Sequence, residues 1–156
     1  MIKLVRLDYR LLHGQIVFSW VNSLSAKRII IVNDEAANSQ TQKSILKLAK
    51  PAGVRLNVFT VEKTLKKFNQ IKSLDENIIL IFGNTQELLA FIKGAPEIKM
   101  VNYGATANKD GALQVGSSVF LDDAAQKDTQ ELLYLGVKIF IQQTPSHSKS
   151  DLTSIN

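Results

Sequence analysis

The stretch RLDYRLLHGQ, residues 6–15, gathers the side chains of this sequence that can do chemistry on a small anion. It contains His13, one of only two histidines in the chain, together with two arginines and an aspartate. A neutral imidazole is a good nucleophile near neutral pH, and a neighbouring cation disfavours its imidazolium form. The guanidinium group also matches phosphate in geometry and charge. The stretch therefore favours a phosphoryl group carried on His13 or bound beside it.

The neighbours of His13 have separate expected roles at such a site. Arg10 lies in the same short segment and is expected to stabilise the phosphate. Asp8 either accepts a hydrogen bond from the histidine ring or orients Arg10 through a salt bridge, and the sequence leaves both open. Gly14 lets an anion approach the backbone closely. The helix expected to begin near Gln15 adds unpaired N–H groups and the positive end of its dipole.

Three other residues are weaker candidates for phosphate binding. Arg6 supplies a second cation, although an arginine within a strand is often only an edge charge. Asn84 follows a predicted strand, so it is expected at the same end of the sheet as His13, and a helix cap is an equal alternative. Gly104 belongs to the segment NYGATAN, residues 102–108, whose backbone N–H groups suit an anion or a tight crossover.

Each residue of the first group also has a plain structural interpretation. A lone histidine between a strand and a helix is commonly a turn or surface residue, and Asp8 at the end of a strand is a common turn former. The spacing alone therefore does not decide between phosphate chemistry and an ordinary loop.

Alternating segments along the chain indicate the elements that must position these residues. Short β-branched runs alternate with helical apolar patterns, which predicts βαβ units in an open, mostly parallel twisted sheet with helices on both faces. Ligands of such sheets bind beyond the carboxyl ends of the strands, and His13 follows the first strand. In the helix near residues 39–50, Ile45, Leu48 and Ala49 are expected to face inward, and Thr85 is expected to cap another helix. The predicted strands are 2–8, 28–33, 54–59, 77–82, 97–102 and 137–142, with one or two weaker strands within 113–121, and the predicted helices are 15–24, 39–50, 61–69, 85–94 and 122–136.

Composition limits the kinds of protein that remain. The length of 156 residues fits a single domain, 1–156, with a polar C-terminal arm or short edge element at 145–156. The chain has no cysteine, which excludes disulfide frameworks and zinc–cysteine or iron–sulfur sites. The histidines and scattered carboxylates do not suggest a metal site, and glycine-rich nucleotide-binding motifs are missing, so no metal or cofactor is expected.

Charge and hydropathy suggest the location and the partners. The net charge is +5, but the lysines are scattered and no nucleic-acid-binding motif appears, so no nucleic acid partner is expected. The apolar runs are far shorter than the roughly 20 residues that a membrane helix needs, and the N-terminal residues do not resemble a signal peptide. A cytoplasmic protein is therefore expected, with any membrane association made through a partner.

The segment VRLDYRLLHGQIVFSWV closely resembles the N-terminal motif of the IIB subunits of the mannose/fructose/sorbose family of the bacterial sugar phosphotransferase system, which has the form VRIDDRLIHGQV. The resemblance extends over about the first 145 residues. It includes RIIIVNDEAAN, the stretch around PAG, the strand and loop IILIFGNT, and IKMVNYGATANKDG. It implies an open α/β sheet, which agrees with the fold expected from the alternation of strands and helices.

The resemblance also implies a function. The family's subunits accept a phosphoryl group from a phosphohistidine on a IIA protein and pass it to a sugar held by the membrane subunits IIC and IID. The matching positions make His13 the carrier, Arg10 the phosphate-stabilising residue and Asp8 its support. The protein is then a phosphotransferase on the inner face of the membrane, and a homo-oligomer stays open.

One residue departs from the family's motif, and two other kinds of protein remain as alternatives. Tyr9 replaces the motif's second aspartate, which removes a negative charge beside the expected phosphate. A regulatory module that keeps His13 as a sensing residue without turnover is one alternative. A basic nucleic-acid-binding α/β domain is the other. The sequence does not reveal the sugar or which ring nitrogen carries the phosphate.

Overall fold

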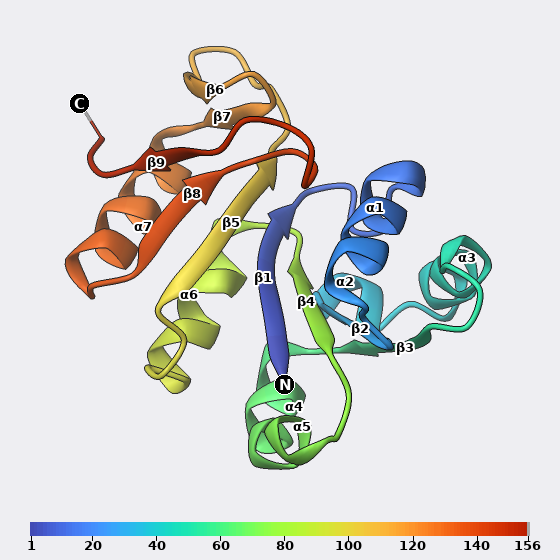
Figure 1. Cartoon of the computed structure of the whole chain (residues 1–156). Coiled ribbons are helices and arrows are strands. Elements are labelled where there is room, and N and C mark those ends of the chain that lie inside the picture. Colours follow the sequence, from blue (N-terminus) through green and yellow to red (C-terminus); the bar gives the residue numbers. More distant parts are fainter. Residues whose placement is uncertain (156) are drawn as a thin grey trace.

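A seven-stranded sheet forms the centre of the molecule in the computed structural model, which describes residues 1–155 (Figure 1). Its strand order is β3-β2-β4-β1-β5-β8-β9, and all neighbouring strands are parallel except the antiparallel pair β8 and β9. Strands β6 and β7 form a separate antiparallel pair. The strands are β1 (Ile2–Asp8), β2 (Arg28–Val32), β3 (Arg55–Phe59), β4 (Ile78–Phe82), β5 (Met100–Ala105), β6 (Leu113–Gly116), β7 (Val119–Leu121), β8 (Lys138–Ile141) and β9 (Ser150–Leu152).

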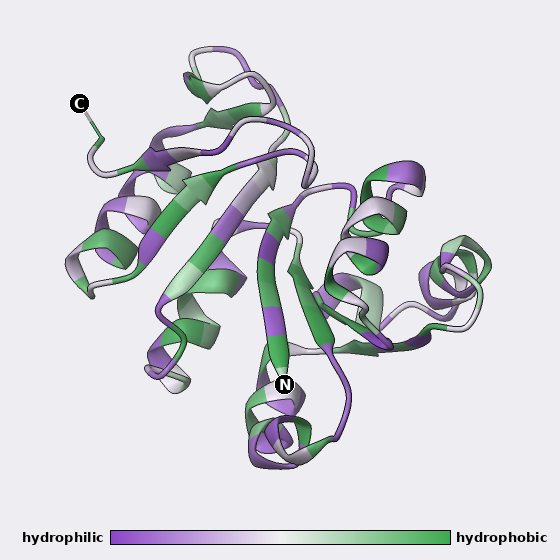
Figure 2. Ribbon diagram, viewed as in Figure 1, coloured by the Kyte–Doolittle hydropathy of each residue, from purple (hydrophilic) through white to green (hydrophobic). Residues whose placement is uncertain are grey.

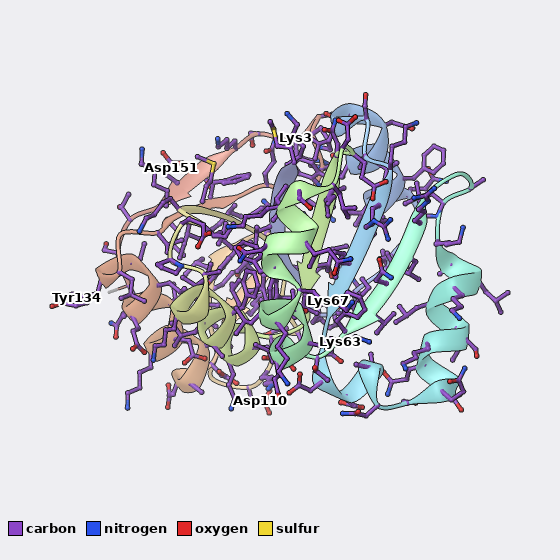
Figure 3. All side chains as sticks on the ribbon, turned by 90° about the horizontal axis from the view of Figure 1, so that it is seen from below. Lys3, Lys63, Lys67, Asp110, Tyr134 and Asp151 are labelled. Carbon is purple, nitrogen blue, oxygen red and sulfur yellow. The ribbon has the colours of Figure 1, made fainter. Side chains whose placement is uncertain are left out.

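Helices cover both faces of this sheet, as the parallel crossovers require. Residues of the first three helices join one hydrophobic cluster, and residues of the last four join a second cluster on the opposite face. Figure 3, which looks at the molecule from below, shows α1 on one side and α6 and α7 on the other. The helices are α1 (Gly14–Leu24), α2 (Asp34–Ala37), α3 (Gln40–Ala49), α4 (Val61–Lys66), α5 (Phe68–Ser73), α6 (Thr85–Gly94) and α7 (Asp123–Tyr134).

Burial of the central strands explains their composition. All five residues of β4 are buried, and Figure 2 shows this strand as continuously hydrophobic. A strand covered on both faces needs apolar side chains at every position. In β1 the side chains alternate, so that Val5 and Leu7 join one cluster whereas Leu4 joins the other. The sheet is therefore the boundary between the two cores.

Strand β1 occupies the position that matters most for the site. It lies between β4 and β5, and the chain leaves it through α1 towards β2, whereas the chain leaves β4 through α6 towards β5. The strand order thus reverses beside β1, and in open α/β sheets ligands bind at such a crevice. The segment between Asp8 and Gly14, which contains His13, lies at the carboxyl end of β1. The structure confirms the predicted fold class of a mostly parallel sheet with helices on both faces.

Some local predictions differ from the structure. Strand β5 runs to Ala105, so Gly104 lies inside a buried strand and not beyond the end of the predicted strand 97–102. Thr85 is the first residue of α6, and Asn84 is its N-cap. Between the predicted strand 28–33 and the predicted helix 39–50 lies the short helix α2, which Asn33 caps by accepting a hydrogen bond from the N–H of Ala36. The C-terminal segment, by contrast, agrees with one of its two predicted forms, because it supplies the antiparallel edge strand β9.

The prediction that Ile45, Leu48 and Ala49 face inward from α3 was wrong. Leu46 is buried, whereas Ile45 is 59% exposed and Leu48 is 89% exposed. Three apolar residues so close together allow two overlapping helical stripes, and periodicity cannot choose between them. Helix α3 follows the short α2 and lies beyond the edge of the sheet in Figure 1, so the sheet covers little of its surface.

Within residues 1–155, none of the helices is both long enough and apolar enough to cross a bilayer.

Candidate active site around His13

A tight loop holds His13 at the surface, between the end of β1 and the start of α1. The N–H of Leu11 donates to the carbonyl of Asp8 over 3.0 Å, and Leu11 adopts a left-handed conformation with φ of 61°. Gly14 also has a positive φ, 39°, where a residue without a Cβ is least strained. His13 is the exposed N-cap residue of α1, and its carbonyl accepts the N–H of Ile16 over 3.1 Å.

The amino end of α1 is open to an anion. No side chain caps it, and its first turn contains no acidic residue. Gly14 and Gln15 are both exposed there. The first N–H groups of a helix have no partner within the helix, and they carry its partial positive charge. An anion bound to the ring of His13 is therefore adjacent to a favourable backbone environment.

Arg10 is fixed beside this loop by a buried carboxylate. Asp8 is fully buried, and its Oδ1 accepts the backbone N–H of Arg10 over 3.0 Å and the Nε–H over 3.2 Å. Nη2 of Arg10 donates to Oδ2 of Asp8 over 3.4 Å. The Arg10 side chain is 23% exposed. Of the two roles left open for Asp8, the structure therefore contains the contact with Arg10.

Tyr9 is exposed and lies under the same arginine. Its ring centroid is 5.6 Å from the guanidinium carbon of Arg10, which is within the range of a cation–π contact. The residue that departs from the family's motif thus adds an aromatic surface where a second carboxylate would add a negative charge.

Arg6 occupies a different environment from Arg10. Its side chain is 1% exposed, and its guanidinium donates to Asp8, to the side chain of Asn102 and to the main-chain carbonyl of Gln142. Burial lowers the pKa of the guanidinium, and the neighbouring carboxylate of Asp8 opposes that effect. A group so enclosed cannot reach a phosphate on an exposed histidine, so this placement does not support the direct phosphate contact expected of Arg6.

Asn84 and Gly104 have structural roles of their own. Asn84 is exposed, but its Oδ1 accepts the N–H of Glu87 over 2.8 Å and its Nδ2 donates to the Glu87 carboxylate over 2.9 Å. Gly104 is buried, and a Cβ there would lie 2.1 Å from the guanidinium carbon of Arg6. The first residue caps α6 and the second makes room for a buried side chain. Neither placement supports a direct contact with a phosphate on His13.

A cavity of about 350 Å³ has Tyr9 among its lining residues. Asn84, Thr85, Lys109 and Asp122 are among its lining residues, whereas His13 is not. Asp122 caps α7 by accepting the N–H of Ala125, and this bond and Lys109 hold the pKa of Asp122 below its usual value. Within the lining, Lys109 thus pairs with Asp122, and Thr85 donates to Asp128.

Two contributors to the site were missed in the sequence. Asn102 is fully buried, and it joins Arg6 to the carbonyl of Gln142. An asparagine inside a predicted buried strand was a usable signal, because buried amides need partners. Gln142 contributes its main-chain oxygen, which accepts a hydrogen bond from Arg6. The identity of the Gln142 side chain gives no sign of this main-chain contact.

Comparison with known proteins decides the family. A model of the family described as "PTS system sorbose subfamily IIB component" matches residues 2–155. The chain belongs to this family. Members are IIB components of the phosphotransferase system, which take a phosphoryl group from a IIA protein and transfer it to sugar at the membrane subunits IIC and IID. This chain is accordingly a phosphotransferase for sugar phosphorylation.

Individual relatives cover almost the whole IIB chain. The sorbose-specific EIIB component of Lacticaseibacillus casei is 33% identical over 97% of this chain and 92% of its own length. The crystal structure of the IIBSor domain of the sorbose permease from Klebsiella pneumoniae has a TM-score of 0.89, with 31% identity over 98% of this chain and 94% of that one. The crystal structure of the N-acetylgalactosamine-specific IIB component 1 of Escherichia coli also has a TM-score of 0.89, with 29% identity over 97% of this chain and 99% of that one.

Proposed function

We propose that His13 is the residue that accepts the phosphoryl group and that Arg10 stabilises it there. The observation that carries this proposal is the combination of an exposed histidine, an uncapped helix end and an arginine fixed by a buried carboxylate. Among the residues that the structure describes, the other histidine is His147, and its Nδ1 lies 2.5 Å from Oγ1 of Thr144. His13 therefore combines exposure with the charges that phosphoryl transfer needs.

The transfer follows from this geometry. A ring nitrogen of His13 attacks the phosphorus of the donor's phosphohistidine, the new N–P bond forms, and the N–P bond to the donor imidazole breaks. Arg10, Gly14, Gln15 and the N–H groups at the start of α1 offset the charge on the phosphoryl oxygens. In the second step a sugar hydroxyl oxygen attacks the same phosphorus, the N–P bond to His13 breaks, and the hydroxyl proton goes to solvent, which leaves the imidazole of His13 free. Asp8 acts by holding Arg10.

The partners follow from the family and from the surface near the loop. Tyr9 on the loop is 48% exposed and Phe18 on α1 is 46% exposed. We assign this surface to docking of the IIA phosphodonor, whose contact is transient. The chain would then work on the cytoplasmic side of the membrane, held there by IIC and IID, as a single domain, 1–156. Both monomer and homo-oligomer are compatible with this role.

The sugar is set by the membrane subunits, but the relatives suggest where to begin. Two relatives at 33% and 32% identity are named sorbose-specific. Sorbose is therefore the first sugar to test, with mannose and N-acetylgalactosamine next because other relatives are named for them.

The proposal is tested by incubating the chain with a phosphorylated IIA protein and measuring phosphate incorporation in wild type, His13→Ala and His147→Ala. Wild type and His147→Ala are expected to accept one acid-labile phosphate, and His13→Ala none. Equal incorporation into His13→Ala would contradict the proposal. Sugar phosphorylation by membranes containing IIC and IID then separates a carrier from a sensor, since a sensor would accept phosphate without passing it on.

A further inference from the structure

Arg6 is the largest fully buried side chain described in the molecule, and phosphoryl transfer as outlined above does not use it. Its Nη1 donates to Oδ1 of Asn102 over 2.6 Å and to the carbonyl of Gln142 over 3.2 Å. Its Nη2 donates to Oδ2 of Asp8 over 3.1 Å. One guanidinium thus joins β1 to β5 and to the end of β8.

Two residues pack close to this guanidinium. A Cβ on Gly104 would come within 2.3 Å of three guanidinium atoms. The Trp20 ring centroid is 5.8 Å from its central carbon. Trp20 is in turn fixed, because its Nε1–H donates to the carbonyl of Gln143 over 3.0 Å. The guanidinium is therefore held by contacts from β5, α1 and the segment after β8.

This arrangement is difficult to explain as a source of stability alone. Burying a guanidinium is costly, and apolar residues of similar volume often replace a buried ion pair without loss of stability. The Nε of Arg6 is buried without a partner, which adds to the cost. A functional reason is present at the other end of the network, because the Asp8 carboxylate that Arg6 holds is the one that holds Arg10.

The charges of this network also support a role for Arg6 at the His13 loop. Two cations, Arg6 and Arg10, share one buried carboxylate, so the group has a net charge of one positive unit at the His13 loop. Arg6 already has neutral acceptors in Asn102 and Gln142. Arg10 is the one of the two cations that solvent reaches, so an incoming anion meets the excess positive charge there.

We propose that Arg6 is a positioning residue for phosphoryl transfer: it locks the Asp8 carboxylate so that Arg10 is already oriented when the phosphoryl group arrives. The inference rests on the proposed function of His13 and Arg10 and extends it to a residue that touches neither donor nor phosphate. Preorganised charge is worth more in a transition state than charge that must reorient. Asn102 then helps by accepting a hydrogen bond from Arg6, and Gly104 helps by leaving room for its guanidinium.

The test is a double-mutant cycle on the rate of His13 phosphorylation by a phosphorylated IIA protein. Arg6→Lys keeps the positive charge but cannot bond Asn102 and Asp8 in the same fork geometry. It is expected to lower the rate at saturating donor by about tenfold, the lower range for a misplaced charge stabiliser, with little change in the donor concentration at half-maximal rate. In an Arg10→Ala background the same change is expected to have less than about a twofold effect, because the group that it positions is missing.

A merely structural role would give a different result. If Arg6→Lys slowed the reaction equally with and without Arg10, the positioning role would be overturned. Val5→Ala is the matched control, because Val5 is buried on the same strand but packs into the opposite core. It is expected to lower the melting temperature and leave the rate in native buffer unchanged.

A second measurement tests the inference even if the chain accepts no phosphate on His13, a result that would defeat the proposed function instead. The Nε–H of Arg10, bonded to Asp8, is expected to give a resolved, slowly exchanging signal in a ¹H–¹⁵N NMR spectrum of wild type. Arg6→Lys, or Arg6→Met if the first variant is unstable, should remove that protection in folded protein. Full retention of the protected signal in a folded variant would contradict the inference.

Discussion

Two helix ends at the same edge of the sheet, those of α1 and α6, have opposite chemistry. At α6, Asn84 accepts the N–H of Glu87 and the carboxylate of Glu87 lies in the first turn. At α1, His13 occupies the N-cap position, no side chain accepts an N–H group, and no acid lies in the first turn. The α6 end is satisfied internally and contributes stability, whereas the α1 end is left open for a ligand anion.

The other helices that directly follow a strand resemble α6. Asn33, Thr60 and Asp122 cap α2, α4 and α7, and each of these helices has an acidic residue in its first turn. Among these helices α1 is thus the exception. The difference indicates that stability has been given up at one place, next to the histidine.

The largest expected effect comes from removing the cation at the open end. Arg10→Ala is expected to slow acceptance of phosphate by roughly 10²–10³-fold, the scale of losing one preorganised charge stabiliser. The rate of His13 phosphorylation by a phosphorylated IIA protein measures it. Arg55→Ala is the control, because Arg55 is 73% exposed on the edge strand β3. A near-normal rate in Arg10→Ala would show that the backbone N–H groups alone stabilise the phosphate.

The two helix ends offer a matched pair of glutamines for the next prediction. Gln15 and Gln86 are each the second residue of their helix, and both are exposed. Gln15→Glu is expected to slow phosphate acceptance by about 2- to 5-fold, since a carboxylate near a helix N-terminus is worth about 0.3–1 kcal/mol and competes with the phosphate there. Gln86→Glu is expected to leave the rate unchanged. Equal slowing in both variants would mean that the two ends do not differ in function.

Loss of the cap at α6 should affect stability and leave the chemistry intact. Asn84→Ala is expected to lower the free energy of unfolding by about 1 kcal/mol, the usual value of an N-cap side chain. Urea denaturation measures the change, and the phosphorylation rate in native buffer should equal that of wild type. A loss of rate as large as that of Arg10→Ala would instead support the phosphate-binding role first expected of Asn84.

A smaller, pH-dependent effect is expected at the capped end of α7. The pKa of Asp122 is lowered by the N–H of Ala125 and by Lys109, so its charge stabilises the fold above the unfolded pKa of about 4 and stops doing so as pH falls through the lower, folded value. Asp122→Asn keeps the cap and removes the charge. It should cost less than about 1 kcal/mol at pH 7. Denaturation at several pH values should show the difference vanish in acid, and a constant difference would exclude this cause.

Much of the fold was predictable because hydrophobic periodicity and the residues that end helices and strands are local signals. Strand β1, helix α1 and the contiguous apolar strands β2 and β4 lie close to their predicted ranges. The end of β5 was placed too early because Gly104 looks like a loop residue. In the structure this glycine accommodates a guanidinium from β1, a contact between residues 98 positions apart that no local pattern contains.

The candidate site was partly predictable, because some of its residues are close together in the sequence. His13, Arg10 and Asp8 lie in one short segment, so their sequence spacing already required that they be close. The sequence ranked Arg10 above Arg6, because Arg10 is three residues from His13 whereas Arg6 lies within the predicted first strand, but it did not show what Arg6 contacts. Burial separates them: Arg6 is enclosed under Trp20 and against Gly104, whereas Arg10 reaches solvent.

The central claim is that the phosphoryl group travels on the ring of His13 at the open end of α1. The most direct measurement is site localisation by tandem mass spectrometry, under conditions that preserve phosphohistidine, after a brief reaction with a phosphorylated IIA protein. Phosphate is expected on the peptide containing His13, and it should disappear when sugar and membranes with IIC and IID are added. Phosphate on the His147 peptide instead, or phosphate on His13 that the sugar never removes, would contradict the claim.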